Sequence, residues 1–288
     1  MKCNVCDSGD LLPFYEGKIR RGKFPNTIDD ARIYKCTACQ VQLFDGQNIN
    51  YETEEYRELV DSDSSASAFY KIHDSEQSAR LSFFDISSYR NATIADVGAG
   101  AGSFLDLVKG FAKQTIAIEP AKQYHQPLRD KGHTVFPYAQ DALQKFSAQA
   151  DLVTSFSVIE HIDEPVAFMK DLVSLCNPGG TVIISTPNSA DWLIDFLPLT
   201  YRPFFYRVVH KWYFNAFAIK QLAEKVGLHD VSIRFKQRFP LTNTLQWIKE
   251  GRPTGHSNPL FSETFESLYQ REVEERGMAD YIYMIAKK

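Results

Sequence analysis

The sequence lacks the features of a secreted or membrane-inserted chain. Its first residues, MKCNVCDSGD, contain no apolar segment of the kind that forms the centre of a signal peptide. The most apolar candidate for a membrane span, Trp192 to Leu199, is far too short for one and contains Asp195. We therefore expect a cytoplasmic protein, in which thiols stay reduced.

The sequence also lacks an excess of positive charge, internal repeats and low-complexity segments. Asp and Glu number 36 against 32 Lys and Arg, and the formal net charge is -4 at pH 7. A dedicated nucleic-acid-binding protein usually has a basic face, so this balance argues mildly against one, although a local basic patch is compatible with it. With 288 residues, 44% of them hydrophobic, the chain can form a large α/β domain and a small module without disulfides.

Cysteines are few, and four of the five lie in the first forty residues as two C-x-x-C pairs. The four are Cys3, Cys6, Cys36 and Cys39. Zn²⁺ prefers four tetrahedral thiolates, and each C-x-x-C turn supplies two of them. We predict a structural zinc ribbon over residues 1–48; the alternatives are two redox pairs or unpaired surface thiols. Cys176 lies on the apolar side of a predicted helix and is expected in the core.

From about Thr93 the sequence alternates between short apolar runs and amphipathic segments. The runs predict strands at 92–98, 115–120, 151–156, 181–186, 231–235 and 281–286. Helices are predicted at 103–111, 121–131, 164–176 and 216–226. Asn215 fits the N-cap of the last helix and Gly227 its C-terminal cap. This alternation predicts a doubly wound α/β domain with a mostly parallel sheet covered on both faces.

The strongest motif is a glycine-rich turn that joins a predicted strand to a predicted helix. It reads Asp96-Val97-Gly98-Ala99-Gly100-Ala101-Gly102. Such a turn faces the crevice at the carboxyl ends of the strands, where open α/β sheets bind ligands. Glu119 ends the next strand, where a carboxylate can accept hydrogen bonds from both ribose hydroxyls of a nucleoside. A dinucleotide fingerprint requires a third glycine where this chain has Ser103, so the fit to that cofactor class is poor.

This loop, with Asp96 two residues before its first glycine, resembles motif I of class I S-adenosylmethionine-dependent methyltransferases. The resemblance covers about residues 90–235, including the segment 151–161 and the turn 177–180. It implies a Rossmann-like, seven-stranded, mostly parallel sheet over residues 91–288, and methyl transfer from S-adenosylmethionine. The cofactor-binding residues that it implies are Asp96, Gly98, Ala99, Gly100, Gly102, Glu119, Pro120, Asp141, Ala142 and Phe156. The alternative is a nucleotide-binding fold without turnover.

Two further regions complete the predicted organisation. Residues 49–90 form a polar, acidic connector in which 51–60 and 64–84 are both predicted to be helical. Insertions at about 186–214 and 240–280 interrupt the pattern on the side of the methyl acceptor. HKWYFN lies just before a predicted helix, where the family builds its acceptor pocket. Weaker candidates for acceptor contacts are Tyr70, His73, His210, Trp212 and Tyr213.

His161 is the candidate base, since an acceptor hydroxyl or carbon must lose a proton during methyl transfer. It follows a predicted strand, and Glu160 is placed to tune it. The alternative is that this segment only starts the next helix, which acidic residues favour. The stretch resembles quinone-pathway O-methyltransferases, in which an acidic residue at the position of Ser157 helps to hold a divalent cation. It also resembles deoxysugar C-methyltransferases, in which a histidine in a similar context is the base.

The zinc-ribbon head is similar to two methyltransferase groups, those that modify ribosomal RNA bases and those of sugar and surface-polysaccharide pathways. A basic cluster in the module is a solvated hairpin or a phosphate-binding strip for RNA or a nucleotide sugar. It comprises Lys18, Arg20, Arg21 and Lys23. We expect a small-molecule or glycan acceptor, methylated on oxygen or carbon in polysaccharide biosynthesis. The alternatives are an RNA base methyltransferase and a regulatory protein without turnover; the oligomeric state stays open.

Overall fold

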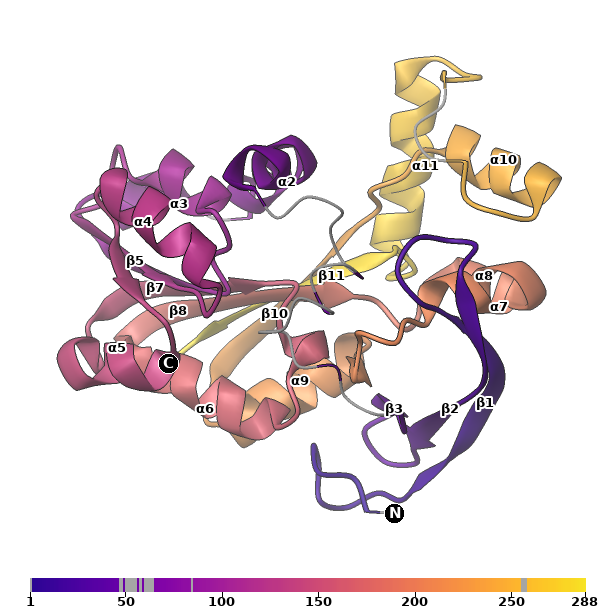
Figure 1. Cartoon of the computed structure of the whole chain (residues 1–288), viewed down its shortest axis with the longest axis horizontal. Coiled ribbons are helices and arrows are strands. Elements are labelled where there is room, and N and C mark those ends of the chain that lie inside the picture. The colour runs from indigo at the N-terminus through magenta and orange to yellow at the C-terminus, as the bar shows by residue number, and fades with distance from the viewer. Residues whose placement is uncertain are drawn as a thin grey trace.

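A seven-stranded sheet forms the centre of the molecule (Figure 1). The computed structural model describes residues 2–46, 49, 56, 59, 65–83, 85–254 and 258–288. The strands are β4 (Thr93–Val97), β5 (Gln114–Ile118), β6 (Thr134–Phe136), β7 (Ala150–Phe156), β8 (Cys176–Pro187), β10 (His229–Lys236) and β11 (Tyr281–Lys287). In the order β10-β11-β8-β7-β4-β5-β6, the strands from β8 to β6 are parallel, and β11 runs antiparallel to both of its neighbours, β8 and β10.

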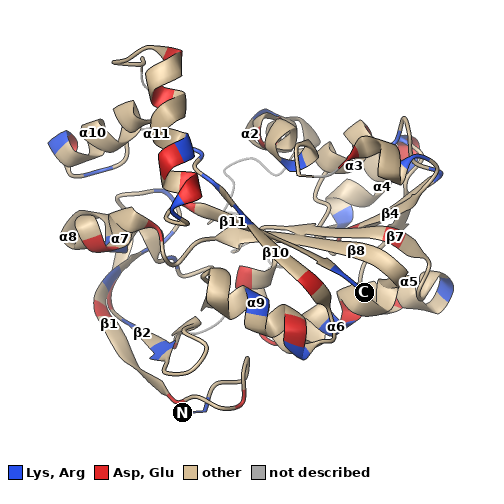
Figure 2. Ribbon diagram, turned by 180° about the vertical axis from the view of Figure 1, so that it is seen from behind, with Lys and Arg blue, Asp and Glu red and all other residues tan. Residues whose placement is uncertain are grey.

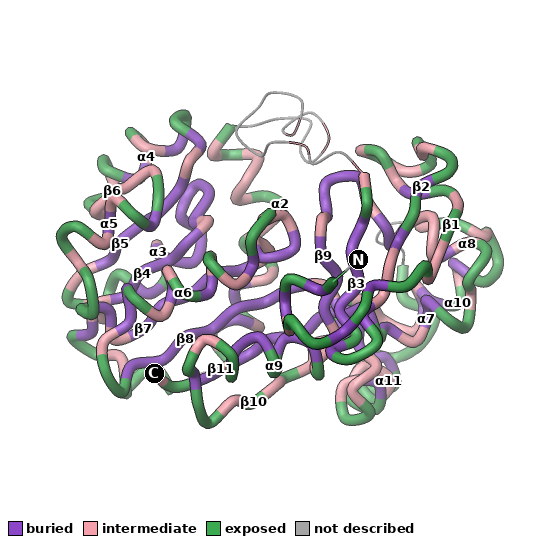
Figure 3. Tube along the Cα trace, turned by 90° about the horizontal axis from the view of Figure 1, so that it is seen from below, coloured by how far each residue is buried: buried purple, intermediate pink, exposed green. Residues whose placement is uncertain are grey.

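The burial of the central strands follows from their composition. A strand that helices cover on both faces needs a nearly continuous apolar run. Both β4 and β7 have such a sequence, and they are buried along most of their length (Figure 3). The Rossmann-like, mostly parallel seven-stranded fold predicted from the sequence is therefore confirmed.

Helices cover both faces of this sheet. Figure 1 shows α3 (Ser103–Val108) and α4 (His125–Asp130) on one face, and α5 (Ala139–Phe146), α6 (Pro165–Leu175) and α9 (Ala216–Lys225) on the other. The predicted caps of α9 are confirmed. The side chain of Asn215 accepts a hydrogen bond from the Ala218 backbone N–H at 2.8 Å, and Gly227 has a φ of 89°.

Two local predictions differ from the structure in detail. The helix predicted at 121–131 is present, but it begins as a 3₁₀ turn (Lys122–Tyr124) and continues as α4. Proline has no backbone N–H and fits only the first turn of an α-helix, so Pro127 limits where α4 can begin. The segment 177–180, expected as a turn, belongs to β8, where it lies at a shift in the register with β7.

Part of the connector forms the helix α2 (Ala66–Leu81), which confirms the helix predicted over 64–84. Ser65 caps it by accepting a hydrogen bond from the Ala68 backbone N–H. The α2 helix contacts α3, on the same side of the sheet (Figure 1). Of the helix predicted over 51–60, only Tyr56 and Leu59 belong to the described residues, and both are helical.

The cysteine module shares a second sheet with the insertion at 186–214. Its strands are β1 (Leu11–Arg20), β2 (Thr27–Cys36), β3 (Gln42–Phe44) and β9 (Trp212–Tyr213), in the order β1-β2-β3-β9. Val5 and Val41 of the module belong to the same buried cluster as Ile219 and Leu222 of α9. The module therefore packs onto the larger domain through a common core.

The two insertions are mainly helical. The first contains α7 (Trp192–Phe196) and α8 (Pro198–Phe205), and the second contains α10 (Leu241–Glu250) and α11 (Glu263–Glu275). The β1–β2 hairpin curves upward alongside α7 and α8 (Figure 1). Ile19 and Ile33 of the hairpin are buried in one cluster with Phe205 of α8 and Trp247 of α10. Within the described ranges, no helix is long and apolar enough to cross a membrane.

Candidate active site

One continuous cavity of about 620 Å³ lies at the carboxyl ends of the central strands. Its walls come from the β4–α3 loop, the ends of β5 and β7, the β6–α5 loop, α2, α8 and the end of β1. Open α/β sheets bind ligands at this edge because the strand order reverses there. We therefore expect the predicted cofactor loop and the predicted base to border this cavity.

The glycine-rich loop requires glycine at two positions on the cavity wall. Gly98 and Gly100 have φ values of 81° and 54°, which side chains other than glycine rarely adopt. A Cβ atom at Gly98 would lie 2.3 Å from Cγ2 of Val158, and one at Gly100 would lie 2.3 Å from the Phe69 ring. The loop can therefore hold this conformation only with glycine at positions 98 and 100.

Glu119 connects this loop to the end of β5. It is 5% exposed. One carboxylate oxygen accepts a hydrogen bond from the Gly100 backbone N–H, and the other accepts one from the Ala121 backbone N–H, both at 2.8 Å. These two bonds fix the side chain, and each carboxylate oxygen has two lone pairs, so a carboxylate in this position can accept from more than one donor. Acceptors of this kind fit the hydroxyl donors of a ribose.

Asp96 supports the start of the loop. It is 3% exposed and accepts a hydrogen bond from the Thr154 hydroxyl at 2.7 Å. Burial raises the pKa of Asp96 to about 6, and the Thr154 hydrogen bond opposes that shift. Next to it, the ring of Phe156 packs edge-on against Phe104, and the Arg80 guanidinium lies 4.5 Å from the Phe156 ring centre.

The structure brings seven of the ten predicted cofactor residues to the cavity. They are Asp96, Gly98, Ala99, Gly100, Glu119, Pro120 and Phe156. The other three are not among the described residues that line it. Gly102 is the N-cap of α3 and packs toward Leu128, Ala142 is fully buried in the core, and Asp141 lies in the first turn of α5. In their place Tyr138, Ala139 and Gln140 line this part of the wall.

Of the α2 residues that line the cavity, the sequence analysis named His73 and missed the other three. Phe69, His73, Glu76 and Arg80 of this helix line the cavity. Their spacing of four, three and four residues places them on one helix face. That stripe of aromatic and charged residues was the available signal. Tyr70, which was predicted to contact the acceptor, instead donates a hydrogen bond to the Ala101 carbonyl in the glycine-rich loop.

His161 and Glu160 border the other end of the cavity. The Nδ1 atom of His161 lies 2.7 Å from the Val209 carbonyl oxygen. Since a carbonyl oxygen only accepts, Nδ1 carries the hydrogen and Nε2 of the neutral ring is an acceptor, with the Tyr56 hydroxyl 3.5 Å away. Burial lowers the pKa of His161 to about 4 and raises that of Glu160 to about 7. The His161 ring is therefore neutral at pH 7.

Ligand atoms of Glu160, His161 and His210 lie within 4.8 Å of one another, so a metal ion has to be considered. The pKa values of both histidines are lowered by burial and further by the positive charge of Arg207. That charge also opposes a divalent cation. Ser157, at the position of the expected acidic ligand, is hydrogen-bonded to the Tyr281 hydroxyl. We assign no metal to this group.

The remaining predicted acceptor residues divide between the cavity and the core. His73 and His210 line the cavity. Trp212 and Tyr213 are 2% and 1% exposed in β9, outside the described lining, and so have packing roles. The Tyr56 hydroxyl lies 3.5 Å from Nε2 of His161.

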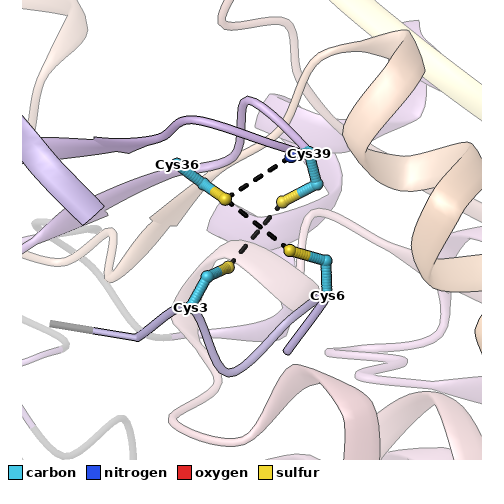
Figure 4. A group of neighbouring side chains, drawn as sticks. All are labelled: Cys3, Cys6, Cys36 and Cys39. Carbon is cyan, nitrogen blue, oxygen red and sulfur yellow. Dashed lines mark hydrogen bonds between the residues drawn. The ribbon is translucent and has the colours of Figure 1, made fainter. Parts of the chain in front are cut away.

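The four cysteines predicted to bind zinc come together in the module (Figure 4). Their sulfur atoms point toward one another, with Cys3 and Cys39 sulfurs 3.7 Å apart and Cys6 and Cys36 sulfurs 3.6 Å apart. Four thiolates about 2.3 Å from a tetrahedral Zn²⁺ would be separated by about 3.8 Å. All four are free thiols, and their positions fit a structural zinc ion.

Gly9 is a residue of this site that the sequence analysis did not identify. A Cβ atom there would lie 2.4 Å from the Cys36 sulfur. The tight approach of the chain to the sulfur cluster explains the glycine. The Lys225 ammonium of α9 donates to the Val5 carbonyl at 2.8 Å, which fixes the first knuckle to the larger domain.

Similarity to known proteins agrees with this geometry. The family described as "Methyltransferase domain" matches residues 71–233, more than half of the chain. A ubiquinone biosynthesis O-methyltransferase of Escherichia coli is 27% identical over 191 residues, which are 60% of this chain and 69% of that protein. The enzyme of the same name from Parvibaculum lavamentivorans is 22% identical over 166 residues, 52% of this chain and 61% of that protein. The chain spans about half to two thirds of the length of such relatives.

A solved structure gives the same result for the fold. A SAM-dependent methyltransferase from Archaeoglobus fulgidus superposes with a TM-score of 0.51 at 20% identity, over 76% of this chain and 96% of that one. The prediction of a class I S-adenosylmethionine-dependent methyltransferase domain is confirmed. The chain belongs to the methyltransferase-domain family.

Proposed function

We propose that this protein transfers a methyl group from S-adenosylmethionine to a hydroxyl of a small-molecule acceptor. One observation carries the proposal. A single cavity contains both the glycine-rich loop with Glu119 and the unprotonated Nε2 of His161. A nucleoside held by Glu119 and an acceptor held near His161 would therefore occupy the same enclosed space.

Bound at the loop, S-adenosylmethionine supplies an electrophilic methyl group. The chain's own residues position the partners, and positioning of this kind is worth up to about 7–11 kcal/mol. The Gly98–Gly100 backbone and Glu119 would hold the nucleoside, and Phe69 covers the loop against water. His161 would accept the acceptor's proton at Nε2, which adds roughly 10²–10⁴-fold in rate.

The acceptor class is argued from the names of the relatives, the cysteine module and the distribution of charge. The names of the relatives support O-methylation of a small molecule. The resemblance of the cysteine module to that of sugar-pathway enzymes supports a sugar or nucleotide sugar of polysaccharide biosynthesis as the acceptor. Along the ribbon in Figure 2, Lys and Arg positions alternate with Asp and Glu positions, and the formal net charge is -4, which argues against RNA as the acceptor.

The zinc proposal concerns the module alone. We infer that Cys3, Cys6, Cys36 and Cys39 bind one Zn²⁺, since their sulfur separations suit a tetrahedral site. The ion would stabilise the module, whose small size leaves little room for a core of its own.

The test is transfer of labelled methyl groups from S-adenosylmethionine into a cell extract, followed by size fractionation and nuclease treatment. Label in nuclease-resistant small molecules or glycans supports the proposal. Label in nuclease-sensitive large material would overturn the acceptor class. The control is the Glu224→Gln variant, which is altered at an exposed position on α9. It should keep activity and label the same fractions as the wild type.

A further inference from the structure

Two arginines are held side by side at the acceptor end of the cavity. Arg20 ends β1, and Arg207 follows α8; the two residues form an isolated parallel β-bridge. The Arg20 backbone N–H donates to the Tyr206 carbonyl at 2.8 Å, and the Val208 N–H donates to the Arg20 carbonyl at 3.0 Å. Both arginine side chains line the cavity. The bridge therefore sets two guanidinium groups on one wall.

Arg20 differs in its partners from Arg80 and Arg238, which also line the cavity. Arg238 meets Asp280 at 2.6 Å, and Arg80 meets Glu76 at 2.8 Å. Arg20 has no carboxylate within 4.0 Å among the residues that the structure describes. Its guanidinium lies 4.1 Å above the Phe204 ring, and its Nε is buried without a hydrogen-bond acceptor in the described part of the chain.

This arrangement leaves positive charge that a ligand could neutralise. Burial, together with the adjacent charge of Arg207, lowers the pKa of Arg20 to about 9. A buried cation without a counterion is unfavourable, and its guanidinium fork matches the oxygens of a carboxylate or a phosphate. The site therefore has the charge and the geometry of an anion site.

The segment that carries Arg207 also positions the candidate base. The Val209 carbonyl fixes the His161 ring, and His210 packs edge-on against it at 4.8 Å between ring centres. A group bound at Arg207 is thus held by the same few residues that orient His161. Aromatic side chains of α8, Tyr201, Phe204 and Phe205, complete the wall and suit an apolar or planar body.

We infer that the methyl acceptor carries an anionic group, a phosphate or a carboxylate, that binds between Arg20 and Arg207. This inference rests on the proposed function, because it identifies the ligand of the same cavity. It also gives the cysteine module a direct role. Arg20 belongs to that module, so the zinc ribbon presents an acceptor-binding side chain to a cavity in the larger domain.

The experiment is calorimetric titration of the full chain, saturated with S-adenosylmethionine, with three probes: phenyl phosphate, benzoate and neutral phenol. We expect the anionic probes to bind and phenol to bind at least tenfold more weakly. The stronger of the two anions identifies the group as phosphate or carboxylate. Arg20→Gln should weaken anion binding by roughly tenfold or more, because a charged hydrogen-bond donor is lost.

Two further variants keep the result interpretable. Arg21→Gln removes the same charge from the exposed neighbouring position and should leave probe binding unchanged. Arg20→Lys retains the charge without the fork, so it should bind carboxylate and phosphate with intermediate affinity even if Arg20→Gln fails to fold. Equal binding of phenol and the anions, or equal effects of Arg20→Gln and Arg21→Gln, would overturn the anion site. If the wild type did not bind S-adenosylmethionine, that result would instead refute the proposed function.

Discussion

Replacing Glu119 by glutamine tests the cofactor end of the cavity, because the two side chains have the same shape. Both oxygens of Glu119 accept hydrogen bonds from backbone N–H groups, those of Gly100 and Ala121. Glutamine has only one oxygen, so in either orientation its amide N–H₂ faces one of these donors. One buried N–H is left without an acceptor, which costs about 1–3 kcal/mol.

The same substitution should weaken cofactor binding. A ribose hydroxyl that donates to a carboxylate loses a charge-assisted hydrogen bond worth about 1.5–3 kcal/mol, so the Kd should rise by roughly 10- to 100-fold. At a ligand concentration of 100 times the wild-type Kd, binding stabilises the wild type by about 2.7 kcal/mol. A 30-fold rise in Kd would reduce that stabilisation to about 0.9 kcal/mol.

Urea unfolding with and without S-adenosylmethionine separates the two effects. Without ligand, Glu119→Gln should lower the free energy of unfolding by about 1–3 kcal/mol. With ligand, the gap to the wild type should widen by roughly 2 kcal/mol more. Glu224→Gln, at an exposed position on α9, should show neither change. Equal stability and equal ligand response of Glu119→Gln and the wild type would refute this account of the site.

Three further predictions concern the base, its pH dependence and the metal. His161→Ala should lower turnover by roughly 10²–10⁴-fold with unchanged S-adenosylmethionine affinity by calorimetry; full turnover would return the residue to a structural role. Because the pKa of His161 is lowered to about 4, its ring stays neutral above about pH 5, and kcat/KM should be independent of this group from pH 6 to 8. A histidine-dependent inflection near pH 6.5, absent in His161→Gln, would contradict that. Elemental analysis should find one Zn²⁺ per chain. Removing this ion with a chelator should weaken binding of the anionic probes at Arg20 more than it weakens binding of S-adenosylmethionine. A larger loss of S-adenosylmethionine binding would show that the module supports the cofactor site.

Patterns of a few residues predicted most of the central domain. The run 92–98 is apolar enough to be buried on both faces, and the glycines after it are the residues that the tight loop requires. The spacing within the pairs Cys3–Cys6 and Cys36–Cys39 likewise predicted that the four sulfur atoms lie close together. In each case a local physical need, burial, a left-handed backbone or thiolate chemistry, restricts the residue types at a fixed spacing.

The rest of the site depends on contacts between distant segments. Arg20 resembled its exposed neighbour Arg21 in sequence, and only the bridge to Arg207, 187 positions later in the numbering, brings it to the cavity. The sequence of α2 places its stripe on one helix face. Nothing in the neighbouring sequence indicates that this face lines the cavity. Tertiary docking of polar residues leaves no short-range pattern, whereas hydrophobic burial does.

The charges of the cavity have opposite effects on the proton transfer that we propose. Arg207 lowers the pKa of His161 and so weakens it as a base. The same field stabilises negative charge on an acceptor oxygen bound nearby, which lowers the pKa of the hydroxyl. Proton transfer depends on the difference between these two pKa values, and the hydroxyl gains most when its anionic group has not already neutralised both arginines. A monoanionic acceptor should therefore react faster than a dianionic one of the same shape, which can be measured by comparing kcat for a sulfate ester and the matching phosphate monoester; faster turnover of the dianion would show that charge placement is not limiting.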